Sequence, residues 1–240
     1  MSRPSAVHGA WLLLACCAAS LLAGTARADM PVTRQWNFNV YLDDREIGYH
    51  RFQLSDSADG MRLETRAEFE VRMFLLTVYA YEHHNTEWWR NGCLQGIEAR
   101  TDSNGKHYRV SGVVRDGGLL VSTAVREHRL DDCVATFAYW DRRLLERDRL
   151  LNSQTGEYQP VKLAPLGPGS LVLGEQTIAV QRYALTAHKL DIELAYAADS
   201  GEWVALDSRL EKGQLLRYRR DAGDLPGLGG ATPAGNLRLE

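Results

Sequence analysis

A strict alternation of charged and uncharged side chains over residues 61–72 constrains the fold of this chain more than any other feature. Every even position from Arg62 to Arg72 is charged, whereas the odd positions hold Met, Leu, Thr, Ala, Phe and Val. At 100° per residue a helix would spread the uncharged set around its circumference, but a β-strand places the whole set on one face. A strand with one apolar and one charged face is typical of an antiparallel sheet that covers a core on one side.

The same period of two returns along most of the chain. Trp36, Phe38, Val40 and Leu42 share one face of a first strand, and Asn104-Gly105 is the strongest signal for a two-residue hairpin turn. Turn residues separate most of the remaining runs. Further extended segments are expected at 47–55, 77–89, 106–114, 119–125, 157–163, 176–186, 190–196, 203–210 and 214–219.

One short segment breaks the strand pattern. Asp141 is suited to cap a helix over residues 142–147, with Leu144 and Leu145 facing the core. About a dozen strands with short connections and a single short helix predict an all-β, single-domain protein. The architecture is expected to be an antiparallel β-sandwich or a half-open curved barrel.

The first 28 residues have the layout of a cleavable signal peptide. Arg3 is followed by an apolar run from Ala10 to Ala23, and Ala26-Arg27-Ala28 forms an A-x-A cleavage site. Cleavage after Ala28 predicts a periplasmic or secreted protein. A retained anchor helix and lipoprotein processing at Cys16 are the alternatives. We expect the β domain to occupy residues 29–220 and the Gly- and Pro-rich residues 221–240 to be a disordered tail.

Composition limits the partners of the chain. Its formal net charge is −3, and the arginines of residues 142–149 alternate with acidic residues instead of forming a basic patch. No nucleic-acid partner is therefore expected. After cleavage, no segment is left that would span a membrane.

Two cysteines, Cys93 and Cys133, remain after cleavage. Two cysteines in an exported protein usually form one disulfide, with two buried thiols as the alternative.

Several aromatic side chains are candidates for a binding site. Tyr79, Tyr81 and His83 share one strand face, which suits a half-polar pocket wall or ordinary amphipathic packing. Trp88 and Trp140, together with other tryptophans, suit a ligand cavity or a core equally. The predicted cavity-lining set is Trp36, Phe38, Phe69, Tyr79, Tyr81, Trp88 and Trp140.

No catalytic, metal or cofactor motif is present in the sequence. His83 and Glu87 share a strand face but lie about 13 Å apart along it, too far for one metal ion to bind both. The chain has no G-x-S-x-G elbow, no P-loop and no G-x-G-x-x-G. We therefore predict no metal and no cofactor.

Several segments together resemble a known family. They are residues 38–43, 47–52, 81–83, 87–88, 93, 133, 136–140, 150–156, 203–208 and 216–218. In these segments the chain is similar to an uncharacterised family of exported bacterial proteins, the domain of unknown function numbered six-one-three-four. The resemblance implies one exported domain and assigns no catalytic residue.

A curved sheet with one apolar face forms cavities readily. The leading hypothesis is therefore a non-enzymatic envelope protein that binds an apolar or amphipathic, lipophilic small molecule.

Two alternatives remain. The first is an exported hydrolase or isomerase built from distant residues, which a histidine bonded to a carboxylate in a cleft would favour. Its candidate residues are His50, His83, His107, Tyr139 and Asp141. The second is an interaction module, which a long uncovered edge strand would favour.

Overall fold

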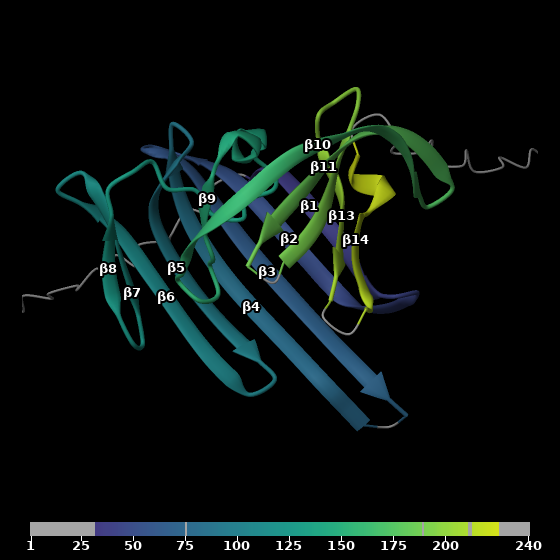
Figure 1. Ribbon diagram of the computed structural model, residues 1–240, viewed down its shortest axis with the longest axis horizontal. Helices are drawn as coiled ribbons and strands as arrows, with labels where there is room; N and C mark the ends of the chain where they lie inside the picture. Colours follow the sequence, from purple (N-terminus) through teal and green to yellow (C-terminus); the bar gives the residue numbers. More distant parts are fainter. Residues whose placement is uncertain (1–31, 75, 189, 211–212, 226–240) are drawn as a thin grey trace, which may run out of the picture.

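The computed structural model describes residues 32–74, 76–188, 190–210 and 213–225, and these residues form one antiparallel sheet of 14 strands (Figure 1). The strands are β1 (Val32–Leu42), β2 (Arg45–Ser57), β3 (Gly60–Met73), β4 (Leu76–Arg90), β5 (Cys93–Ser103), β6 (Lys106–Arg115), β7 (Gly118–Thr123), β8 (Glu127–Leu130), β9 (Arg149–Leu151), β10 (Tyr158–Leu173), β11 (Gln176–Ala187), β12 (Leu190–Ala197), β13 (Trp203–Arg209) and β14 (Leu215–Arg220).

The order of the strands shows why the sheet is open. It runs β8-β7-β6-β5-β4-β3-β2-β1-β14-β13-β12-β11-β10-β9, so the first and last strands pair at its centre and β8 and β9 lie at its ends. The prediction of an all-β half-open curved barrel is confirmed. The sandwich alternative is wrong, because the strands form one continuous sheet instead of two packed layers.

The alternation predicted for residues 61–72 is the pattern that β3 adopts. Leu63, Thr65 and Ala67 are buried, whereas Glu64 and Arg66 are exposed. The register with β4 pairs Leu63 with Glu87 and Ala67 with His83, so β4 continues the same two faces.

The buried face of the sheet curves around one main core. Phe38 of β1 lies 4.1 Å from Trp203 of β13, measured between ring centroids, and Trp140 lies 6.0 Å from Trp36 and 5.7 Å from Trp89. These contacts join strands from both halves of the sheet across its concave side.

A connection between β8 and β9 crosses the interior. We call residues 133–140 the strap. Leu94 of β5 donates its backbone N–H to Val134 O at 2.8 Å, and Leu151 of β9 donates to Ala135 O at 2.8 Å. The disulfide between Cys93 and Cys133, with Cα atoms 4.9 Å apart, fixes the start of the strap to β5. The strap therefore bridges strands that lie far apart in the sheet order.

The predicted short helix follows the strap as the 3₁₀ helix η1 (Arg142–Glu146). Asp141 caps it by accepting a hydrogen bond from the Arg143 N–H at 3.1 Å, and Leu144 is buried as predicted.

The C-terminal boundary differs from the sequence expectation. Residues 221–225, predicted to begin a disordered tail, form η2 (Ala222–Asp224) and bury Leu225. The buried Arg220 donates to Asp224 O at 3.3 Å, and Asn37 donates to the Asp224 carboxylate at 2.5 Å, which holds this turn against β1. The predicted signal peptide and residues 226–240 of the predicted tail lie outside the described residues.

In the described part of the chain, no helix is long and apolar enough to cross a membrane.

Candidate functional site

A pocket of about 290 Å³ lies inside the curve of the sheet. One wall comes from β2, β3 and β4, and the other from β12, β13 and β14. Strap residues 136–139 and residues 152–154, after β9, close one side. The lining residues are His50, Phe52, Leu63, Thr65, Tyr81, His83, Asn85, Glu87, Thr136, Phe137, Ala138, Tyr139, Asn152, Ser153, Gln154, Leu190, Ile192, Leu206, Ser208, Leu210, Leu216 and Tyr218.

The strand register brings the two histidines of the pocket, His50 and His83, onto the same wall. His50 of β2 faces Ala67 of β3, and Ala67 faces His83 of β4. Because neighbouring strands lie about 4.8 Å apart, the backbones of His50 and His83 are separated by about 10 Å. Ala67, which lies between the two histidines, has a small side chain that leaves the space between the two imidazole rings open.

Glu87 is the most deeply placed acid of the pocket. Its carboxyl accepts hydrogen bonds from Asn85 Nδ2 at 2.8 Å, Trp89 Nε1 at 2.9 Å and Thr136 Oγ1 at 3.3 Å. Burial raises the pKa of Glu87, although these three hydrogen bonds act in the opposite direction. Among the described residues no cation forms an ion pair with Glu87, so the site favours the neutral acid.

Both pocket histidines are held neutral. His83 Nδ1 lies 2.8 Å from Thr101 Oγ1, and burial lowers the pKa of His83 to about 4. His50 stacks on Phe52 with ring centroids 4.2 Å apart, and burial holds the pKa of His50 well below its usual value. Neither ring nitrogen of His50 has a hydrogen-bond partner in the described part of the chain.

Three tyrosines complete the polar side. Burial raises the pKa values of Tyr81, Tyr139 and Tyr218, so all three keep their protons. Tyr81 donates to Gln154 Oε1 at 3.2 Å. Asn85 Oδ1 is buried without a hydrogen-bond partner among the residues that the structure describes. The pocket thus holds several polar groups that the protein does not satisfy.

The opposite wall, formed by β12, β13 and β14, is apolar apart from Ser208 and the hydroxyl of Tyr218. Ser208 lies between Ile192 and Leu216 in the register of β12, β13 and β14. Leu206 and Leu190 extend this wall. An uncharged polar wall facing an apolar wall suits an amphipathic molecule.

The structure separates the five residues that sequence reasoning grouped as a binding site. Tyr81 and His83 line the pocket. Tyr79 lies nearer the hairpin tip, where its hydroxyl is 3.2 Å from Ser103 Oγ. Trp140 packs between Trp36 and Trp89 in the core.

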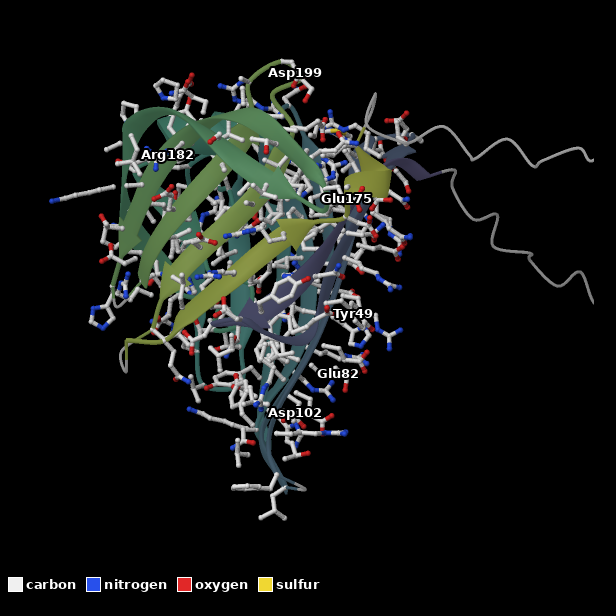
Figure 2. All side chains as sticks on the ribbon, turned by 90° about the vertical axis from the view of Figure 1, so that its right-hand side faces the viewer. Tyr49, Glu82, Asp102, Glu175, Arg182 and Asp199 are labelled. Carbon is white, nitrogen blue, oxygen red and sulfur yellow. A yellow bond between two sulfur atoms is a disulfide. The ribbon has the colours of Figure 1, made fainter. Side chains whose placement is uncertain are left out.

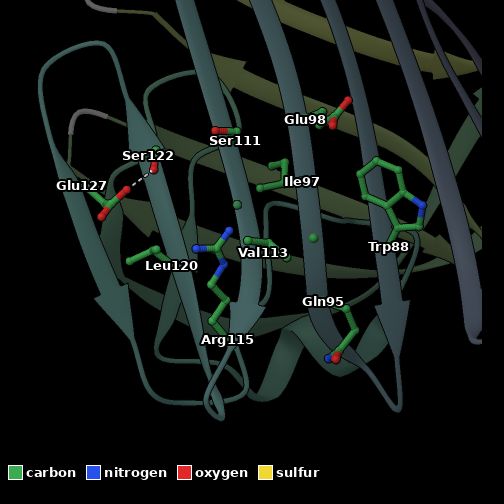
Figure 3. Close-up of a pocket in the computed structure, with 12 residues that line it drawn as sticks. Trp88, Gln95, Ile97, Glu98, Ser111, Val113, Arg115, Leu120, Ser122 and Glu127 are labelled. Carbon is green, nitrogen blue, oxygen red and sulfur yellow. Dashed lines mark hydrogen bonds between the residues drawn. The ribbon is translucent and has the colours of Figure 1, made fainter.

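Trp88 lies on the outer face of the sheet, where it lines an open groove of about 500 Å³ (Figure 3). Its indole covers Gly96, since a Cβ built at Gly96 would lie 3.2 Å from the ring. The ionisable residues of this groove, Glu98, Arg115 and Glu127, are exposed. Trp88 is therefore remote from the buried polar groups of the interior pocket.

The remaining predicted positions also fall in different places, some in the core, some in the pocket and some outside both. Trp36 and Phe38 belong to the core, and Phe69 stacks on Tyr81 at 5.2 Å. His50 and Tyr139, candidates in the enzyme hypothesis, line the pocket, whereas His107 is exposed and Asp141 caps η1.

Sequence reasoning missed Asn85, Glu87, Thr136 and Tyr218 as lining residues. The period of two that identified Tyr81 and His83 also places Asn85 and Glu87 on the same face of β4, so extending it would have found them. Thr136 and Tyr218 reach the pocket through the strap and the central strand pair, for which the sequence has no local signal.

The described residues contain no group of three His, Cys, Asp or Glu side chains that could hold a metal ion.

The fold and the pocket define a class of protein: an open, curved antiparallel half-barrel with an amphipathic interior. The chain belongs to the family of the domain of unknown function DUF6134, whose model matches residues 38–221. No curated protein matches the chain.

The chain is also similar to a solved structure, the beta-barrel-like protein of the domain of unknown function DUF1849 from Brucella abortus. The sequence identity is 10% and the TM-score is 0.55, over 80% of this chain and 97% of that chain. At this identity the similarity shows the fold alone.

Proposed function

We propose that this protein is a non-enzymatic envelope protein that binds an uncharged, amphipathic small molecule in its interior pocket. The observation that carries the proposal is the set of buried polar atoms of His50 and Asn85 that have no hydrogen-bond partner among the described residues: both ring nitrogens of His50 and Asn85 Oδ1 line a pocket of about 290 Å³. Buried polar groups without partners cost stability unless a ligand or water completes their hydrogen bonds.

The charge state of the pocket narrows the ligand class. His50 and His83 are neutral, and Glu87 has no cationic partner among the described side chains. A carboxylate or phosphate would be buried beside Glu87 without a counter-charge, which is unfavourable. We therefore expect an acyl or isoprenoid chain that ends in a hydroxyl or carbonyl group.

The test asks whether filling the pocket with a larger side chain abolishes retention of the ligand. Protein purified from its native envelope and extracted with organic solvent should release a stoichiometric lipophilic compound. Ser208→Phe fills the pocket from its apolar wall and should abolish retention. Ser111→Phe, an exposed position on β6, is the matched control and should retain the compound. Equal retention by both variants would contradict the proposal.

Probe binding tests the ligand class separately. A medium-chain alcohol should change the tryptophan fluorescence at lower concentration than the carboxylate of the same chain length. Preference for the carboxylate would mean that the polar wall carries positive charge, contrary to the pKa directions of His50 and His83.

Two observations disfavour the alternative functions. His83 bonds to Thr101 and His50 has no partner, so within the described ranges neither pocket histidine is bonded to a carboxylate. Such a pair in the pocket would have favoured the enzyme hypothesis, and the histidine–carboxylate pairs His84–Glu82 and His107–Asp102 lie among exposed side chains outside the interior pocket. β10 pairs with β9 only over Tyr158–Pro160, but Pro165 and Pro168 interrupt the free edge beyond it and make it a poor template for a partner strand.

Export is part of the same proposal, supported by the signal-peptide layout of residues 1–28 and by the disulfide. N-terminal sequencing of the envelope product should read Asp-Met-Pro-Val, beginning at Asp29. A lipid-modified Cys16 at the N-terminus would contradict cleavage after Ala28.

A further inference from the structure

The hairpin of β3 and β4 extends past the neighbouring strands at one end of the molecule (Figures 1 and 2). Its end carries exposed apolar side chains: Phe74 is 98% exposed, Leu76 72% and Val78 44%. Exposed apolar groups gathered at a projecting tip mark an interaction site more often than the same residues scattered over a surface.

From this tip we infer that the hairpin docks on a lipid bilayer. The inference rests on the proposed function and extends it, because a protein that binds an amphipathic ligand must take it from, or deliver it to, a phase in which that ligand dissolves. We call Phe74, Leu76 and Val78 the apolar tip.

The length of the uncharged end of the hairpin matches the depth to which peripheral proteins enter a membrane interface. Residues 73–81 carry no charge, and charged residues resume at Arg72 on one side and Glu82 on the other. At about 3.3 Å per residue, Phe74 reaches about 7 Å beyond Arg72. Apolar elements of peripheral proteins enter the boundary between headgroups and acyl chains by about 5–10 Å, so the charged residues would stay at headgroup level.

The shape of the tip favours a fluid surface over a protein socket. Phe74 occupies the turn, whereas Arg72 and Thr77 pair just behind it at a β-bulge next to Val78. The apolar groups thus lie at the end of a narrow two-stranded ribbon and not on one flat face. A bilayer surrounds such an end on all sides, but a protein partner would have to form a closed cavity around it.

An aromatic path connects the tip to the pocket. The register pairs Val71 with Tyr79 and then Phe69 with Tyr81, and Tyr81 lines the pocket mouth. Phe69 and Tyr81 stack with an interplanar angle of 10°. A lipophilic chain could pass from the tip to the pocket along this inward face of the hairpin without crossing a charged side chain.

The test is vesicle flotation of the protein purified from its native envelope, with its N-terminus sequenced beforehand. We expect the wild type to float with phosphatidylcholine vesicles. The double variant Phe74→Asp with Leu76→Asp should float at least tenfold less. Asp tolerates the positive φ of 55° at position 74, so this variant should fold. Val125→Asp is the matched control, since Val125 is 90% exposed but stands alone in the β7–β8 turn, and it should float as the wild type does.

A second readout places the tip in the bilayer. In Phe74→Trp, brominated acyl chains should quench the added fluorescence when the bromine is shallow, and less when it is at the bilayer centre. The docking inference is overturned if the wild type does not float, if the double variant floats equally well, or if Val125→Asp loses flotation to the same extent.

Failure of docking and failure of ligand binding can be told apart. Ser208→Phe should lose ligand retention yet still float, whereas the double variant should retain ligand that was bound before it is added to vesicles. Vesicles that contain phosphatidylglycerol test whether anionic headgroups add to the effect. Unchanged flotation with them indicates that the apolar tip alone accounts for docking.

Discussion

The indole Nε1 of Trp89 donates a 2.9 Å hydrogen bond to the carboxyl of Glu87, two residues earlier on the same face of β4, and both side chains are buried. This contact ties the pocket to the aromatic core, because Trp89 also packs against Trp140. The protonation state of Glu87 therefore bears on both the pocket and the stability of the fold.

Glu87→Gln tests whether the buried acid is neutral. Because burial raises the pKa of Glu87 above its ordinary value of 4.5, the folded state holds this proton more tightly than the unfolded chain. The stabilisation is fully present below pH 4.5 and is lost as the pH rises through the folded pKa. Gln keeps the hydrogen bonds from Trp89 Nε1 and Thr136 Oγ1, and its NH2 group can donate to Asn85 Oδ1 once the Asn85 amide turns over. Urea unfolding should show the wild type losing stability relative to Glu87→Gln as the pH rises above 4.5. The matched control is Glu98→Gln, which removes an exposed acid on β5.

His83→Gln should change the acid sensitivity of the protein. The pKa of His83 falls from 6.5 to about 4, so its stabilising effect is complete above pH 6.5 and is lost as the pH falls toward 4. The full loss corresponds to about 3 kcal/mol. Gln can keep the hydrogen bond to Thr101, so the variant should lose less unfolding free energy on acidification, measured by urea titration. The matched control is His84→Gln, which replaces an exposed neighbour on the other face of β4. His50 and His128, whose pKa values burial also lowers, contribute to the pH dependence that remains in His83→Gln.

Gly48→Ala should destabilise the sheet severely. Gly48 has φ of 153°, and a Cβ there would lie 1.9 Å from the backbone oxygen of Glu68 on β3. Strands β2 and β3 would have to separate, at a cost of more than about 2 kcal/mol. Gly105→Ala is a matched comparison, because Gly105 also has positive φ (83°) but no atom within 4 Å of the added Cβ. It should cost only about 1 kcal/mol. Equal losses in chemical denaturation would show that backbone conformation, not the close approach of β3, determines the effect.

Removing the disulfide should weaken both the fold and the pocket. Cys93 and Cys133 are 40 positions apart, and closing such a loop stabilises by about 4 kcal/mol in the chain-entropy model. The double Cys→Ser variant should lose stability of this order in urea. It should also retain less ligand, because the strap begins at Cys133. Denatured, unreduced protein that begins at Asp29, and so lacks Cys16 and Cys17, should contain no free thiol in a colorimetric titration, and two thiols per chain would contradict the bond.

The sequence predicted the local parts of this structure well and the long-range parts poorly. Alternation identified β3 and its two faces because the period of two is a property of one strand, and Asp141 identified η1 because capping is local. The pairing of β1 with β14 has no such signal, so the sheet order could not be derived and the sandwich remained an open alternative.

The candidate site shows the same division. Tyr81 and His83 were found because they share one strand with a clear period. Trp88 and Trp140 were grouped with them by residue type alone, and the structure places one on the outer face and the other in the core. The boundary at residue 220 was set by composition, which contains no information about the hydrogen bonds that Arg220 and Asn37 make to Asp224.

The central pairing of β1 with β14 has a consequence for the order of folding. Phe38 pairs with Arg220, so the middle of the sheet joins residues separated by almost the whole domain, whereas neighbouring strands on either side are successive hairpins. The two halves can form early from nearby residues, but their junction must wait until the last strand has been synthesised. Until then β1 and β13 each present an unpaired edge that other chains can occupy. A ribosome-bound or truncated chain that ends before β14 should therefore depend on chaperones to stay soluble.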